Sequence, residues 1–201
     1  MAKNLKFSHE EGQTPIEDLS GLLLPIRTMA ELNDAEAKNN AKAYAQYLVF
    51  MPALEKLNLL AVQSLCGIHR EMFGEVWSWA GELRKGGVKN IGCVSVQIGS
   101  EFHKLMAEER RWEEEKRPVL EIVARIHHRL VWIHPFENGN GRWARLVANI
   151  YLRQRALSLL EWPKDIKFIR ENFRPQYLTA LKKADHGDFE ALIELHRDYS
   201  N

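Results

Sequence analysis

Hydrophobic residues return every three or four positions along most of this chain, which is the spacing of one face of an α-helix. Prolines interrupt this pattern at Pro52, Pro118, Pro135 and Pro163, where a helix loses a backbone donor and is kinked or broken. The pattern therefore predicts separate helices over residues 28–50, 54–73, 101–116 and 119–133, another from about 143, and two closing helices over 166–183 and 188–196.

The first helix carries a signal for its start. Thr28 is followed three residues later by Glu31. This spacing predicts a capping box, in which each side chain accepts a hydrogen bond from a backbone N–H at the helix end. We therefore expect Glu31 to act in capping.

One segment departs from the helical pattern. Val94, Val96 and Ile98 alternate with polar residues, and glycines are frequent from position 81 to position 99. A period of two is typical of a β-strand with one buried face. We expect a short β-hairpin over about residues 83–98, in an otherwise all-α, mostly helical domain.

The domain organisation follows from length and composition. Glycines and prolines punctuate residues 1–27, which we interpret as an N-terminal arm. Residues 28–201 are short enough for a single domain, and 45% hydrophobic residues in the chain supply a core without disulfides or metals.

Charge and hydropathy argue against two classes of function, nucleic-acid binding and membrane insertion. The 28 basic and 27 acidic residues leave a formal net charge of +1, which argues against direct binding of nucleic acid by bulk attraction. The longest apolar run, Leu22–Leu24, is far shorter than a membrane span, and the first residues lack a secretory signal. We expect a cytoplasmic protein in which Cys66 and Cys93 stay reduced.

The chemistry is concentrated at residues 134–145. Gly139 and Gly141 flank Asn140 where a new helix begins, and backbone N–H groups at a helix N-terminus bind anions. Arg142 and Arg145 lie three residues apart on the first turns, so both guanidinium groups reach the same region. His134, just before this nest, is suited to accept a proton at neutral pH.

This stretch resembles the signature of the Fic (filamentation induced by cAMP) domain family, His-x-Phe-x-Asp/Glu-Gly-Asn-Gly-Arg-x-x-Arg. Other stretches are also similar to Fic proteins, so the resemblance covers about residues 54–196; they are Ile68–Phe73, Trp79–Arg84, Tyr177–Leu181 and Ala184–Asp188. The N-terminal residues, including Thr14–Ile16 and Leu19–Leu22, resemble a subgroup called mobile mystery protein B, which implies a bacterial protein with a helix-turn-helix partner.

The resemblance implies a Fic fold and the transfer of AMP from ATP to a hydroxyl of a target protein, with release of pyrophosphate. It implies His134 as the general base and Phe136 as a packing anchor beneath the loop. It places the α- and β-phosphates on the backbone around Gly139 and Gly141 and on the side chain of Asn140. Arg142 also contacts the phosphates, Arg145 corresponds to the arginine that binds the γ-phosphate, and Asn138 belongs to the same phosphate-binding loop.

The motif departs from the family pattern at Asn138, where an Asp or Glu is usual. In the family that carboxylate contacts Mg²⁺, and an amide offers only a neutral oxygen. Asn138 is therefore a weak candidate metal ligand, and Mg²⁺ is an uncertain cofactor.

The resemblance also implies a flap that pairs with the target protein and a glutamate that restrains activity. The flap corresponds to Lys89, Asn90, Ile91, Gly92, Cys93, Val94, Ser95 and Val96. The chain has no clean copy of the inhibitory helix, in which a Glu pairs with the second motif Arg. Glu36 is the candidate for that role, although an exposed charge is the interpretation we favour for it.

The residues leave alternatives open. His127 shares a helix face with His134, which with His69 or His103 raises a zinc site. On the same fold, another phosphate-containing transfer or the removal of AMP is an alternative reaction. Asn138 also raises a different class, a catalytically weak nucleotide-binding partner of a DNA-binding protein.

Overall fold

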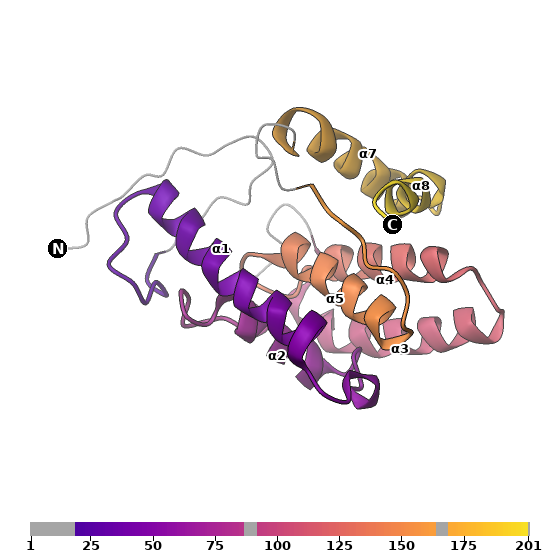
Figure 1. Cartoon of the computed structure of the whole chain (residues 1–201), viewed down its shortest axis with the longest axis horizontal. Helices are drawn as coiled ribbons and strands as arrows, with labels where there is room; N and C mark the ends of the chain where they lie inside the picture. The colour runs from indigo at the N-terminus through magenta and orange to yellow at the C-terminus, as the bar shows by residue number, and fades with distance from the viewer. Residues whose placement is uncertain (1–18, 87–91, 164–168, 201) are drawn as a thin grey trace.

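The computed structural model describes residues 19–86, 92–163 and 169–200. Its α-helices are α1 (Met29–Ala45), α2 (Val62–Phe73), α3 (Ile98–Glu114), α4 (Val119–Ile133), α5 (Asn140–Gln154), α7 (Arg174–Asp185) and α8 (Glu190–Asp198) (Figure 1). Short 3-10 turns occur at Leu54–Lys56 and Ser95–Gln97, and π-helical turns at Gln46–Phe50 and Ile169–Phe173.

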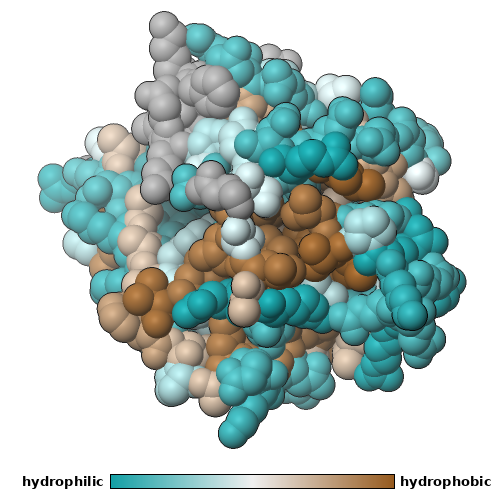
Figure 2. All heavy atoms as spheres, turned by 45° about the vertical axis from the view of Figure 1, so that its right-hand side comes forward, coloured by the Kyte–Doolittle hydropathy of each residue, from teal (hydrophilic) through white to brown (hydrophobic). Residues whose placement is uncertain are grey.

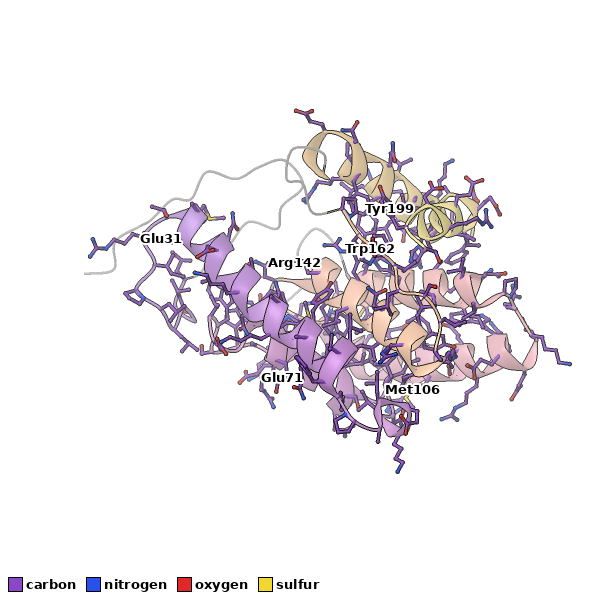
Figure 3. The ribbon with its side chains drawn as sticks, in the orientation of Figure 1. Glu31, Glu71, Met106, Arg142, Trp162 and Tyr199 are labelled. Carbon is purple, nitrogen blue, oxygen red and sulfur yellow. The ribbon has the colours of Figure 1, made fainter. Side chains whose placement is uncertain are left out.

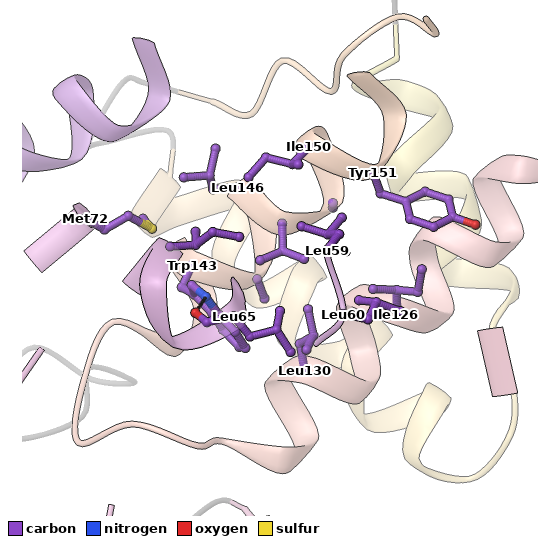
Figure 4. Close-up of a cluster of buried hydrophobic side chains, with 14 of the residues drawn as sticks. Leu59, Leu60, Leu65, Met72, Ile126, Leu130, Trp143, Leu146, Ile150 and Tyr151 are labelled. Carbon is purple, nitrogen blue, oxygen red and sulfur yellow. Dashed lines mark hydrogen bonds between the residues drawn. The ribbon is translucent and has the colours of Figure 1, made fainter. Parts of the chain in front are cut away.

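Helix α4 is central to this arrangement. It packs against α3, α5, α7 and α8, while α1 lies along α2 (Figure 1). Its residues Ile126 and Leu130 are completely buried, as its regular apolar spacing predicts. They meet side chains of α2 and α5 in the main core, among them Leu65, Trp143 and Ile150 (Figure 4). This packing fixes the end of α4 relative to the start of α5.

The capping box at the start of α1 is confirmed. Thr28 Oγ1 accepts the N–H of Glu31 at 3.1 Å, and Glu31 Oε2 accepts the N–H of Thr28 at 3.2 Å. Glu31 is thereby held at the helix end, as its spacing from Thr28 predicts.

Helix α2 begins later than its hydrophobic spacing predicts. A helix was expected from residue 54, but α2 starts at Val62 after a 3-10 turn. The side-chain amide of Gln154, from α5, donates to the carbonyls of Leu54 at 2.9 Å and Leu57 at 2.8 Å. A tertiary partner therefore takes carbonyls that a continuous helix would use within itself.

The prediction of a β-hairpin over residues 83–98 is wrong for the part of this segment that the structure describes. Ser95–Gln97 is a 3-10 turn that leads directly into α3. The alternating residues do not share a buried face, because Ile98 lies in the core while Val96 is 91% exposed. Elsewhere in the described ranges the only β-pairing consists of two isolated bridges, Leu22 with Trp77 and Leu160 with Ser200. Lys89, Asn90 and Ile91 lie outside the described residues.

The described end of the arm docks on the body. Leu23 N–H donates to the carbonyl of Val76 at 2.9 Å, and Ser78 N–H donates to that of Gly21 at 2.8 Å. Gly21 lies against the indole of Trp79, where a Cβ would come within 2.4 Å of a ring carbon. Residues 21–23 thus pair with the segment that follows α2.

The surface mixes polar and apolar residues. On the face shown in Figure 2, hydrophobic residues gather in a central band bordered by hydrophilic ones. Scattered exposed hydrophobic residues are ordinary on globular proteins. Among the described residues, no helix combines the length and apolar content needed to cross a bilayer.

A chain of buried hydrogen bonds joins α4 to α7 and α8. His196 Nδ1 donates to the Leu192 carbonyl at 2.7 Å, because a carbonyl only accepts. His196 Nε2 therefore accepts from His127 Nδ1 at 3.0 Å, and His127 Nε2 accepts from the Tyr177 hydroxyl at 2.9 Å. Both nitrogens of His127 are used, so His127 is a structural residue rather than a zinc ligand.

Burial makes the folded state sensitive to acid. It lowers the pKa of His69 to about 3 and that of His196 to about 4, and it holds the pKa of His127 well below its usual value. In the unfolded chain these imidazoles take up protons below about pH 6.5, while the folded chain excludes them. Stability should therefore fall as the pH drops from 6.5 toward 4.

We expect the free energy of unfolding in urea to be lower at pH 5 than at pH 7, by at most about 2 kcal/mol per buried histidine. Urea titrations followed by circular dichroism at the two pH values would measure this difference. Equal free energies of unfolding at both pH values would contradict the neutral state assigned to these three histidines.

Candidate active site

The loop between α4 and α5 is closed by its own asparagine. Asn140 Oδ1 accepts the N–H of Phe136 at 3.0 Å, and Asn140 Nδ2 donates to the Phe136 carbonyl at 2.9 Å. The side chain is buried and both of its polar atoms are used. It therefore shapes the loop, which differs from the expectation that this side chain itself holds phosphates.

Gly139 allows the tight entry into α5. It has a φ of +79°, and a Cβ at this position would lie 2.5 Å from the ring of Phe73. Only glycine fits both constraints. Among the described residues no side chain caps the start of α5. The N–H groups of its first turn lack partners within the helix and are suited to bind an anion, and the nest itself stays a prediction.

His69, buried in α2, orients this nest. The N–H of Gly81 donates to His69 Nδ1 at 3.0 Å, so the proton of the neutral ring is on Nε2, which donates to the Asn138 carbonyl at 3.0 Å. In a trans peptide the C=O and the N–H point in opposite directions. Because His69 draws the Asn138 carbonyl into the core, the N–H of Gly139 faces the other side.

Aromatic packing supports the same loop from below. The ring of His69 stacks on Phe136 at a centroid distance of 3.7 Å, and Phe136 meets Trp143 edge-on at 4.9 Å. Phe136 is completely buried. This is the position beneath the loop that the resemblance implied for it.

His134 lies at the end of α4, and only one of its ring nitrogens has a partner among the described residues. Its Nδ1 lies 3.3 Å from the Val131 carbonyl, and since a carbonyl only accepts, Nδ1 carries the proton. Nε2 then holds the lone pair. Burial, reinforced by the charge of Arg84, lowers the pKa of His134, which keeps the ring neutral at pH 7. The residue is thus prepared to accept a proton.

Arg142 extends from the start of α5 toward α1 (Figure 3) and forms an ion pair. Its Nη1 donates to Glu36 Oε2 at 2.6 Å, while Glu36 Oε1 accepts from the indole of Trp77 at 2.7 Å. Glu36 is only 3% exposed, so our interpretation of it as an exposed charge is wrong. Its partner is the first arginine of the motif and not the second.

Arg145 differs from Arg142 in having no carboxylate partner. Its guanidinium carbon lies 6.0 Å from the ring centres of both Trp162 and Tyr177. In the part of the chain that the structure describes, it forms no ion pair. Beside the N-terminus of α5, this leaves one positive side chain available to an anionic ligand.

The site offers little to a magnesium ion. Asn138 supplies no charge, and its Oδ1 already accepts the N–H of Gly139 at 2.6 Å. Mg²⁺ is usually held by one or two carboxylates together with phosphate oxygens. Among the described residues, no group of three or more His, Cys, Asp or Glu side chains is placed to hold a metal. Asn138 as found here does not fit the role of a magnesium ligand.

The described end of the predicted flap touches the catalytic candidate. Gly92 has a φ of +120°, and a Cβ there would lie 2.8 Å from the Cβ of His134. Cys93 is buried behind it, whereas Val94 and Val96 are exposed. The segment therefore lies beside His134 as expected, although in a different conformation from the predicted strand.

Sequence reasoning missed the roles of His69, Trp77 and Arg84. His69 and Arg84 fall within the stretches that resemble Fic proteins, but local spacing assigned them no chemistry. Most of their partners lie 12 to 69 residues away along the chain. Contacts at such separations leave no periodic pattern in a single sequence.

The orientation of the nest by His69 can be tested with two variants. In His69→Gln the side-chain amide nitrogen takes the position of Nε2 and can still donate to the Asn138 carbonyl. In His69→Asn the amide ends near Nδ1 and that donor is lost. We expect His69→Asn to weaken ATP binding about tenfold, measured by calorimetry, and His69→Gln to stay closer to wild type.

Thermal unfolding of both His69 variants controls for loss of the fold. Equal ATP affinity in folded His69→Asn, His69→Gln and wild type would show that the bond from His69 to Asn138 does not position the nest.

Comparisons with known proteins agree with this geometry. The protein adenylyltransferase Fic of Nematostella vectensis is 28% identical over 177 residues, covering 86% of this chain and 39% of that protein. This chain therefore spans about two fifths of the length of that relative.

Two solved structures share the fold. The N-terminal Fic domain of a VirB-translocated Bep effector from Bartonella quintana has a TM-score of 0.69 at 19% identity, covering 98% of this chain and 92% of that chain. BepC from Bartonella tribocorum, solved with bound AMPPNP, has a TM-score of 0.67 at 19% identity, covering 96% and 95%. Residues 59–152 match the sequence model of the Fic/DOC family, and the chain thus carries a Fic/DOC domain.

Proposed function

We propose that this protein transfers AMP from ATP to a hydroxyl group of a target protein and releases pyrophosphate. The observation that carries the proposal is the neutral His134, whose Nε2 has no partner among the described residues and which precedes the uncapped N-terminus of α5 by one short loop. A relative named protein adenylyltransferase Fic and a neighbouring structure with bound AMPPNP support ATP as the substrate.

The residues divide the reaction between them. His134 Nε2 takes the proton of the target hydroxyl, and the hydroxyl oxygen forms a bond to the α-phosphorus of ATP. The bond from that phosphorus to the bridging oxygen breaks, and pyrophosphate leaves. The N–H groups of Asn140 and Gly141 hold the phosphates, and the N–H of Gly139 joins them once it exchanges its bond to Asn138 Oδ1 for a phosphate oxygen. Positioning of this kind accounts for most catalysis in phosphoryl transfer.

The two arginines neutralise the charge that the phosphates bring. Arg145 has no competing carboxylate, so it binds the phosphate chain directly. Arg142 is held by Glu36 and becomes available only when that ion pair opens.

The target segment binds along residues 89–96 in this proposal. The exposed Val94 and Val96 follow the buried Cys93, and Gly92 packs on His134. A target that bonds to this backbone places its hydroxyl near Nε2 of His134 with little demand on its own side chains.

The cellular setting is also a proposal. A cytoplasmic, bacterial protein of the mobile mystery protein B subgroup with a helix-turn-helix partner remains our expectation from the N-terminal resemblance. Mg²⁺ would have to be held mainly by the phosphates and water, since Asn138 contributes no carboxylate.

Labelled ATP tests the transfer. Wild-type protein incubated with α-labelled ATP and a cell lysate should transfer label to protein, whereas γ-labelled ATP should not. His134→Ala should reduce the transfer at least a hundredfold, because it removes the general base. Mass spectrometry of the labelled protein would identify the adduct as AMP and locate the modified hydroxyl.

The outcomes of the labelling experiment separate the alternatives. Label from the γ-position would indicate phosphorylation, and loss of AMP from a modified protein would indicate the reverse reaction. ATP binding without any labelling would contradict transfer and favour a regulatory role, for which the neutral Asn138 is the motivating observation.

Glu36 restrains this activity in our proposal. Its carboxylate is buried and neutralises Arg142, a residue that the phosphates need. Glu36→Gln keeps an oxygen for the Trp77 indole but removes the charge, so we expect ATP affinity and labelling to rise about tenfold.

The matched control is Asp34→Asn on the same helix, where an exposed carboxylate pairs with Lys38 at 2.7 Å. We expect no change in the Asp34→Asn protein. Unchanged ATP affinity in folded Glu36→Gln would show that the ion pair with Arg142 does not limit nucleotide binding.

A further inference from the structure

Arg84 is a buried cation whose guanidinium donates to several backbone carbonyls. It is 5% exposed and lies outside the loop that carries the motif. Its Nε donates to the carbonyl of His134 at 2.6 Å, and its Nη2 donates to those of Ile133 at 3.5 Å and Cys93. Its Nη1 donates to the carbonyl of Gly86 at 3.4 Å.

These carbonyls include the end of α4. The last carbonyls of a helix have no partner within the helix and carry the negative end of its dipole. A guanidinium at this end satisfies Ile133 and His134 and offsets that partial charge. The backbone N–H of Arg84 also donates to the carbonyl of Pro135 at 2.9 Å, so one residue binds three consecutive carbonyls.

The backbone of His134 needs such support. It has a φ of +49° and a ψ of +59°, the left-handed conformation, which costs about 1 kcal/mol or more for a residue with a Cβ. The conformation turns the chain out of α4 and into the loop that leads to α5. The bond from Arg84 to the His134 carbonyl opposes a return of that residue to helical angles.

Arg84 also connects His134 with the segment beside it. A Cβ at Gly92 would lie 2.9 Å from Nη2 of Arg84 and 2.8 Å from the Cβ of His134. Gly92, His134 and the guanidinium therefore meet without space for another group. Because the same Nη2 binds the Cys93 carbonyl, the segment and the histidine are anchored to one side chain.

We propose that Arg84 is a positioning residue, which holds His134 in its left-handed conformation and ties it to the Gly92–Cys93 backbone, next to the surface where a target hydroxyl arrives. This role rests on the proposed function of His134 as the base. A planar fork of donors suits it, because carbonyls from three segments must be reached at once.

The test compares Arg84→Gln and Arg84→Lys with wild type. Nuclear magnetic resonance of the backbone at His134, through its HN–Hα coupling and its Cα shift, reports whether φ is positive. Single-turnover labelling at saturating ATP reports catalysis, and calorimetry reports ATP affinity. The control is Arg111→Gln, an exposed arginine of α3 that lies far from these carbonyls in sequence and pairs with Glu115 at 3.7 Å.

In Arg84→Gln we expect the His134 signals to lose their left-handed values and the labelling rate to fall about a hundredfold, while the dissociation constant for ATP changes less than about twofold. Arg84→Lys keeps the charge and some of the hydrogen bonds, so its labelling rate should be about tenfold higher than that of Arg84→Gln. Arg111→Gln should match wild type in all three measurements.

Two results would overturn the proposal. One is that the NMR signals of His134 in Arg84→Gln still indicate a positive φ. The other is that the labelling rate falls only in proportion to the loss of ATP affinity or of folded protein. If Arg84→Gln does not fold, the His134 signals of Arg84→Lys decide the question. If wild type labels nothing, the proposed function fails, whereas the signals of His134 still decide the role of Arg84.

Discussion

The left-handed backbone at the two ends of the α4–α5 connection is the constraint on which the site depends. His134 leaves α4 with a φ of +49°, and Gly139 enters α5 with a φ of +79°. Between them the chain reverses so tightly that the C-terminus of one helix and the N-terminus of the next are close together. The first carries the proposed base and the second exposes amide donors, so one reversal brings together the two chemical groups that the proposed reaction needs. Everything around the connection supports it: Asn140 closes the loop, His69 orients its peptide and Arg84 holds its first residue.

The histidines show how hydrogen bonding separates a base from structural residues of the same type. His69 and His127 use both ring nitrogens on protein partners. Their protons are fixed, and burial prevents them from gaining another. The pKa of His134 is also lowered, but its imidazole ring has only one described partner, the Val131 carbonyl. Its second ring nitrogen therefore keeps a usable lone pair. Its chemistry thus arises from what the fold leaves unpaired.

The sequence correctly predicted the features that depend on interactions between residues close together in the chain. The capping box of Thr28 and Glu31, the apolar face of α4 and the uncapped glycine-rich start of α5 each depend on residues a few positions apart, and each is present. The failures came from distant partners. Gln154 takes the carbonyls that would have extended α2, and Ile98 turns inward as the first residue of α3 rather than as part of a strand. Glu36 looked like a surface charge because nothing in its own helix revealed Arg142 and Trp77, which come from 106 and 41 residues away.

The distribution of charge explains why a single ion pair, that of Glu36 with Arg142, has a large effect on the proposed binding of phosphates. A net charge of +1 provides no general attraction for a polyphosphate, so binding depends on the dipole of α5 and on two arginines. Glu36 neutralises one of them, and burial strengthens that pairing relative to an exposed bridge. Asn138 supplies no carboxylate, so it adds no charged protein ligand for a cation that accompanies the phosphates. In the function proposed above, Arg142 therefore offsets a larger share of the phosphate charge. Its release from Glu36 is then a larger part of the proposed nucleotide binding than it would be in a site with an acidic residue at position 138.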